Sequence, residues 1–237
     1  MFSLYEPNHD LSEPEVRFRH PQPDPFRSGS QAKALPKLGG IDPRTPVETK
    51  NGPVQARLLS KGDRVLTLHH GFRPLIWVGR IQMTYVGYAR DTPVRFAPGA
   101  VGKSRFSKPS LFAPHQKICL QHIMNEVFFG TPDVVATCRD LVSMTGISRV
   151  ERPMVMDWVQ LLFDATELVQ ADGLWCESLL PDMDVLRGIA PRQASEIEGI
   201  VPALRFEAGK AAYTQTCPEL NEKEIELLRA NGSQHAS

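Results

Sequence analysis

The chain has 237 residues, 41% of them hydrophobic, which is enough to bury a core. Its 27 basic side chains (Lys and Arg) balance its 27 acidic ones (Asp and Glu), and no long run carries one sign, so neither a nucleic acid nor a membrane is an expected partner. The first ten residues lack the basic and apolar regions of a signal peptide, and no apolar run approaches the ~20 residues of a membrane-spanning helix. A cytoplasmic location is therefore favoured, with non-classical secretion as the alternative.

The first segment, residues 1–39, is rich in proline and polar residues and shows hardly any apolar periodicity. Such a composition cannot bury enough apolar surface to offset the entropy of ordering the chain. We predict that this segment is a disordered leader, an arm rather than a domain.

Residues 40–181 consist of short apolar segments separated by turn residues. The Asn51-Gly52 pair predicts a hairpin, because these residues accept the positive φ of a two-residue turn. Strands are predicted over residues 46–49, 54–56, 64–69, 72–79, 93–96, 111–113, 117–121, 126–129, 147–152, 158–163, 167–171 and 174–178. Many short strands without a long helical period predict an all-β domain.

Residues 182–237 have a helical pattern and are predicted to form a small C-terminal extension. One short helix is expected within residues 191–204. A second is expected after Asn221, which would cap it together with Glu224, and it would stop at Asn231-Gly232. Its apolar face spans only two turns, so it must dock on the β-domain to be stable.

The stretch LFAPHQKICLQ, residues 111–121, is the first place to look for chemistry. Two apolar strands, Leu111–Ala113 and Lys117–Gln121, meet there at a Pro-His-Gln corner. A tight corner of this kind aims polar side chains, such as His115, at whatever the strands enclose.

Several motifs follow one another along residues 40–181: KGDRVLT, PLIWVGR, PGAVG, and a closing block that runs from LLFDATE to ESLLP. In this order they resemble the Hint (Hedgehog/intein) domains, and more closely a bacterial branch found in many marine alphaproteobacteria. The resemblance implies a pseudo-twofold, all-β horseshoe of short strands. It also implies autoprocessing or protein splicing, in which the first residue of the domain attacks the peptide carbonyl before it.

That reaction has three chemical requirements. The first residue needs a thiol or hydroxyl, because its sulfur or oxygen must replace the amide nitrogen. A nearby His must protonate the departing nitrogen, since an amide ion is not expelled near neutral pH. Hydrogen-bond donors must stabilise the tetrahedral oxyanion.

This chain departs from the family at the positions that carry the chemistry. The resemblance places Gly40 at the nucleophile, and glycine has no side chain. It places Ala113 and Gln116 where the hydroxyl and the catalytic His of the corner belong, and Thr166 where the closing block carries His. We therefore expect a degenerate active site in a domain that has lost self-cleavage. It would serve as a structural or peptide-binding module, with its own N-terminal segment or another peptide as partner.

An active domain is the alternative. His115 lies one residue before the family's His position, and in an extended segment such a shift turns a side chain to the other face, although a corner is irregular. With His115 and an external nucleophile such as water, the domain would cleave near Gly39-Gly40. Asp164 is the second candidate catalytic residue, as a general base. The competing interpretation is that its carboxylate caps the turn before Glu167.

A zinc cluster at His115, Cys119 and His122 is a further hypothesis, because imidazole and thiolate suit zinc. On a strand, however, Cys119 and His122 face opposite sides. The fourth ligand would have to come from a distant residue: His69, His70 or Asp164. We therefore expect neither a metal nor a cofactor.

The four cysteines are scattered and form no C-x-x-C pair, so neither a zinc ribbon nor a disulfide framework is predicted. Most are expected to be buried free thiols. A third functional hypothesis is an unrelated hydrolase in which Cys119 or Cys138 pairs with His115 or His122, and it requires a reactive thiol.

Overall fold

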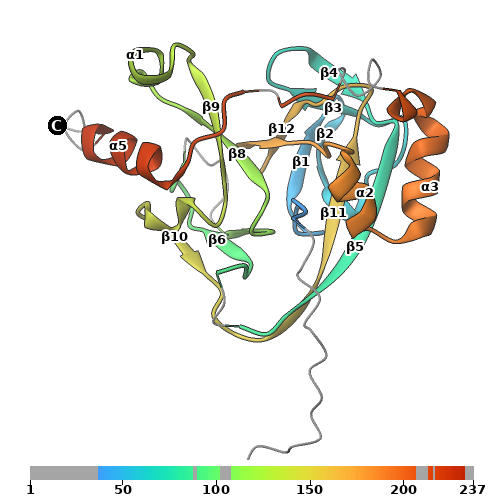
Figure 1. Cartoon of the computed structure of the whole chain (residues 1–237), viewed down its shortest axis with the longest axis horizontal. Helices are drawn as coiled ribbons and strands as arrows, with labels where there is room; N and C mark the ends of the chain where they lie inside the picture. Colours follow the sequence, from blue (N-terminus) through green and yellow to red (C-terminus); the bar gives the residue numbers. More distant parts are fainter. Residues whose placement is uncertain (1–36, 88–89, 102–107, 207–212, 216, 233–237) are drawn as a thin grey trace, which may run out of the picture. The chain divides into compact units, whose positions relative to one another are not determined.

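The computed structural model of the protein describes residues 37–87, 90–101, 108–206, 213–215 and 217–232 (Figure 1). The strands are β1 (Pro46–Thr49), β2 (Gly52–Gln55), β3 (Arg64–Thr67), β4 (Gly71–Pro74), β5 (Trp77–Tyr85), β6 (Val94–Phe96), β7 (Ser110–Phe112), β8 (Lys117–Gln121), β9 (Asp133–Thr137), β10 (Ile147–Arg149), β11 (Met154–Leu162), β12 (Leu168–Ala171) and β13 (Leu174–Glu177). The helices are η1 (Ala56–Leu58), α1 (Asn125–Phe129), η2 (Leu141–Ser143), α2 (Met183–Gly188), α3 (Pro191–Ile200), η3 (Pro202–Arg205) and α5 (Glu222–Gly232), where η marks a 3-10 helix. The all-β fold class is confirmed. The predicted leader lies outside the described residues except for its last three.

The larger sheet is antiparallel and runs in the order β2-β1-β3-β12-β13-β8-β9, with β4 paired to β3 beside this path. The predicted Asn51-Gly52 hairpin is confirmed, since β1 pairs with β2 from Pro46 opposite Gln55 to Thr49 opposite Gly52. The turn between β12 and β13 uses Asp172 and Gly173, both at positive φ. These residue types are the ones that tolerate such a conformation.

The chain around Ile41 joins the two smaller sheets, β10-β6-β7 and the β5–β11 ribbon. Ile41 forms isolated bridges with Phe112 of β7 and with Val159 of β11. The start of the β-rich region therefore lies inside the fold, paired on both sides, and not at a free edge.

Two apolar clusters form most of the core. One of them contains Trp77, Trp158 and Leu38 together with Ile197 of α3, which explains why α2 and α3 lie beside β5 and β11 in Figure 1. The other cluster fills the space between the larger sheet and the β6–β7 region, and Ile225 of α5 packs against it.

The C-terminal helix α5 is capped as the sequence predicts. The Asn221 side chain accepts a hydrogen bond from the Glu224 backbone N–H at 3.2 Å, and the Glu224 carboxylate accepts one from the Asn221 N–H at 2.8 Å. This reciprocal pair is a capping box. The prediction that the helix docks on the β-domain is also confirmed, through Ile225.

Three local predictions were wrong or incomplete. The segment 126–129, predicted as a strand, belongs to helix α1, where the Asn125 side chain donates to the carbonyls of Leu120 and Pro132 and ties the turn closed. The predicted strand 72–79 is two strands, because the chain leaves the larger sheet after Pro74 and joins the ribbon at Trp77. Strand β9 was missed.

Candidate functional site

The peptide bond between Gly39 and Gly40 is held by two glutamine side chains. Gln160 of β11 donates through Nε2 to the Gly39 carbonyl oxygen at 2.7 Å. The Gly40 N–H donates to Oε1 of Gln116 at 2.7 Å, and the Gly40 carbonyl accepts from the Ala113 N–H at 3.0 Å. Both polar atoms of this peptide are therefore satisfied by the protein interior.

The orientation of the Gln116 amide follows from its partners. The side chain is buried, and Nε2 donates to the Lys117 carbonyl at 3.0 Å and to the Glu177 carbonyl at 2.8 Å. Since carbonyls only accept, the nitrogen must face them and the oxygen must face Gly40. Gln116 therefore offers the Gly40 nitrogen an acceptor and no proton.

Neither glycine of this peptide has room for a side chain. At Gly40 a Cβ would lie 2.5 Å from the Cβ of Trp158, and the φ of +151° is one that only glycine adopts readily. At Gly39 a Cβ would lie 2.8 Å from Oε1 of Gln116. The surrounding side chains therefore leave space only for glycine at both positions.

Leu38 fixes the chain on the other side of this peptide. Its side chain is 1% exposed and belongs to the same apolar cluster as Ala113, Trp158 and Leu179. A small cavity of about 100 Å³ lies next to it, lined in part by Gly39, His115, Gln116, Gln160 and Ser178.

Residues 41–183 match the protein family described as the Hint domain. The chain belongs to the Hint-domain family. Among solved structures, the gp41-1 intein is 11% identical, with a TM-score of 0.35 over 58% of this chain and 97% of that one. The MchDnaB-1 intein is 10% identical, with a TM-score of 0.37 over 59% of this chain and 99% of that one. No curated protein matches the chain. The closer resemblance to an alphaproteobacterial branch stays a prediction.

The Hint resemblance assigns four substituted positions to the family's active site: Gly40, Ala113, Gln116 and Thr166. The structure brings Gly40, Ala113 and Gln116 together through direct hydrogen bonds. Thr166 is buried in the closing block but does not line the cavity beside Gly39. The nucleophile position and the Pro-His-Gln corner are therefore adjacent, and the closing block reaches this site through Glu177 and Ser178 rather than through Thr166.

His115 lies beside this site. Its side chain is 8% exposed and lines the same cavity as Gly39, and its Nε2 is 3.5 Å from Oδ1 of Asp91. Burial, followed by the positive charge of Arg139, lowers the pKa of His115. The imidazole is therefore neutral at pH 7 and is able to accept a proton.

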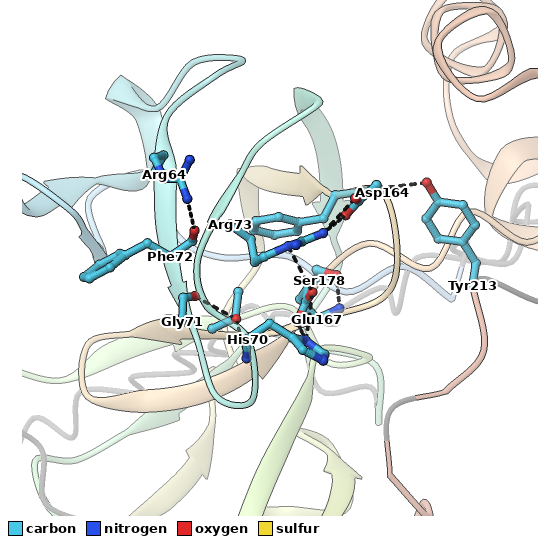
Figure 2. Close-up of polar contacts among 11 residues, drawn as sticks. Arg64, His70, Gly71, Phe72, Arg73, Asp164, Glu167, Ser178 and Tyr213 are labelled. Carbon is cyan, nitrogen blue, oxygen red and sulfur yellow. Dashed lines mark hydrogen bonds and ion pairs between the residues drawn. The ribbon is translucent and has the colours of Figure 1, made fainter.

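Asp164 lies elsewhere, in the ion-pair cluster of Figure 2. It accepts two hydrogen bonds from the Arg73 guanidinium, at 2.7 and 2.9 Å, and its side chain is 58% exposed. The neighbouring Glu167 accepts from Nδ1 of His70 at 2.9 Å. These contacts tie β4 to the closing block, and Asp164 does not line the cavity beside Gly39. Its role as a general base stays a prediction.

Sequence reasoning missed Gln160 and Leu38. Gln160 is the one polar side chain in the apolar stretch Trp158–Phe163, which was the available signal. Leu38 gave none, because it falls in a proline-rich and polar segment whose composition predicts disorder.

The cysteines test the hydrolase hypothesis. All four are buried and none forms a disulfide, and burial raises the pKa of the Cys119, Cys138 and Cys176 thiols. We expect iodoacetamide at pH 7.5 to leave the folded protein unlabelled and to label every cysteine in urea, as read by intact mass. Rapid labelling of Cys119 or Cys138 in the folded protein would favour the hydrolase.

Within the described residues, no group of three or more His, Cys, Asp and Glu side chains lies close enough to hold a metal ion. None of the helices in the described ranges has the length and apolar character needed to cross a membrane.

Proposed function

We propose that this Hint-like domain does not cleave itself. Instead, it holds Gly39-Gly40, the junction peptide where its relatives cleave, as a bound segment of its own chain. The observation that carries the proposal is the environment of Gly40. The residue lacks a nucleophile, and its backbone conformation and the contact with Trp158 leave no space for one.

The chemistry of the site supports the same conclusion. One of the three family requirements is met, because the Gln160 amide donates to the Gly39 oxygen, where an oxyanion would form. The other two are not. No thiol or hydroxyl adjoins the Gly39 carbonyl on residue 40, and the group facing the Gly40 nitrogen is an acceptor, which cannot protonate a leaving group.

The partner in this proposal is the chain's own N-terminal segment. Leu38 is buried among apolar side chains, and the following peptide is bonded on both faces. Segments held in this way stabilise the domain that binds them. The domain is thus a structural module that binds a peptide, on a scaffold shared with self-processing relatives.

A second candidate function, hydrolysis of the same peptide by water, is favoured by the position of His115 next to Gly39. His115 would take a proton from water, hydroxide would add to the Gly39 carbonyl carbon, and the bond to the Gly40 nitrogen would break once that nitrogen gained a proton. Because His115 is neutral at pH 7, this rate would be full there and would fall on acidification through its lowered pKa.

Intact-mass analysis separates the two. The purified full chain, held for days at pH 5 to 9 with and without hydroxylamine and a thiol, is expected to keep one mass, that of residues 1–237. A fragment beginning at residue 40 would contradict the proposal. If that fragment is lost in His115→Ala but kept in the matched variant His69→Ala, the water mechanism is supported instead.

A further inference from the structure

The junction segment, residues 38–41, lies in a slot formed by Ala113, Gln116, Trp158 and Gln160. We propose that this slot is specific for an extended peptide of the pattern Leu-Gly-Gly followed by an apolar residue. The inference rests on the proposed function, because a peptide that is cleaved would not stay in the slot.

Backbone pairing explains why an extended peptide is bound. The Ile41 N–H donates to the Val159 carbonyl at 3.1 Å, and the Val159 N–H donates back to the Ile41 carbonyl at 2.9 Å. On the other side, the Ala113 N–H donates to the Gly40 carbonyl at 3.0 Å. The segment therefore lies as a strand between β7 and β11. Such main-chain bonds give affinity and carry no sequence information.

The two apolar side chains of the segment point into different cores. Leu38 packs with Trp77, Trp158 and Leu179 in the cluster covered by α2 and α3. Ile41, at 3% exposure, belongs to the other cluster. A peptide with polar residues at these two positions would bury unpaired polar groups, which the slot cannot satisfy.

The slot selects glycine at positions 39 and 40 because a Cβ at either position would clash with a neighbouring side chain. A Cβ at position 39 would meet Gln116 Oε1, and this side chain cannot turn away without losing its hydrogen bonds to Gly40, Lys117 and Glu177. A Cβ at position 40 would meet the Cβ of Trp158, an atom fixed by the backbone of a fully buried residue. Displacing either Gln116 or Trp158 would cost free energy, so the slot rejects any residue other than glycine at both positions.

A rescue experiment on the full chain tests this specificity. In Gly40→Val the chain's own segment no longer fits, and a synthetic peptide of residues 35–42, LPKLGGID, is expected to bind and to raise the Tm. The same peptide with Ala in place of either glycine is expected to bind about tenfold more weakly or worse. Gly62→Val is the matched control, since Gly62 has φ +97° with nothing near its Cβ position, and it should not respond to any peptide.

A second measurement applies even if Gly40→Val does not fold. Gly39 lacks a positive φ, so Gly39→Ala reports the contact with Gln116 alone, and it is expected to lower the Tm by roughly 2–4 °C or more. Gly199→Ala in α3, where nothing surrounds the new methyl, should not lower it. Equal binding of the Ala peptides, or equal Tm values for these two variants, would overturn the inference. Intact mass of the same samples reports cleavage, which would contradict the proposed function instead.

Discussion

The double variant Gly40→Cys/Gln116→His is expected not to recover self-cleavage, although it supplies both residue types that the family uses. The new Cβ would lie 2.5 Å from the Cβ of Trp158, on a backbone with φ +151°. The Gln116 change also removes an acceptor from the Gly40 N–H and a donor from the Glu177 carbonyl. The introduced Cys side chain therefore cannot be accommodated at position 40 unless the backbone moves.

The expected result is an intact mass together with a free energy of unfolding lower by about 3 kcal/mol or more. Backbone strain, overpacking and unpaired buried polar groups each contribute on the order of 1–3 kcal/mol. A loss of this size is a large part of the ~5–15 kcal/mol that stabilises a domain. Urea denaturation measures it, and Gly62→Cys controls for the strain without the clash. A thioester trapped by hydroxylamine, or a fragment beginning at residue 40, would contradict this prediction.

The scaffold of the domain was predictable because its signals are local. Asn51-Gly52 favours a tight turn through its own backbone preferences, and Asn221 with Glu224 forms a capping box from four neighbouring residues. The segment around Glu126 was predicted wrongly because its apolar residues suit a strand, whereas the side-chain bonds of Asn125 decide in favour of a helix.

The site was predictable only in part. The resemblance assigned Gly40, Ala113, Gln116 and Thr166 to one active site. Hydrogen bonds join the first three, whereas Thr166 does not line the cavity beside Gly39. What fills the slot was not predictable, because it depends on the sequence-distant Gln160 and on the way Trp158 approaches Gly40. Glycine at position 40 predicts from the sequence alone that the nucleophile is lost. It does not predict that Trp158 occupies the space in which a nucleophilic side chain would lie.

A negative charge at position 116 is expected to destabilise the slot. Gln116→Glu keeps the shape of the side chain and one oxygen facing Gly40. It replaces the donor Nε2 by an oxygen within 2.8–3.0 Å of two carbonyl oxygens, those of Glu177 and Lys117. A buried carboxylate facing two acceptors is unfavourable, so at pH 7 the variant is expected to lose about 3 kcal/mol or more of unfolding free energy.

Protonation reverses much of this loss, because the carboxylic O–H donates to one of the two carbonyls. The folded state then holds its proton more tightly than the unfolded chain. The stability difference from the natural protein is therefore smallest below about pH 4 and grows by about 1.4 kcal/mol per pH unit above it, until the folded carboxyl ionises. Urea titrations from pH 4 to 8 measure this, with Gln193→Glu as control, since Gln193 donates to the Arg80 carbonyl at an exposed site. If the loss of unfolding free energy did not change with pH, residue 116 would not face the two carbonyls. That outcome would contradict the placement of Gln116 against Gly40.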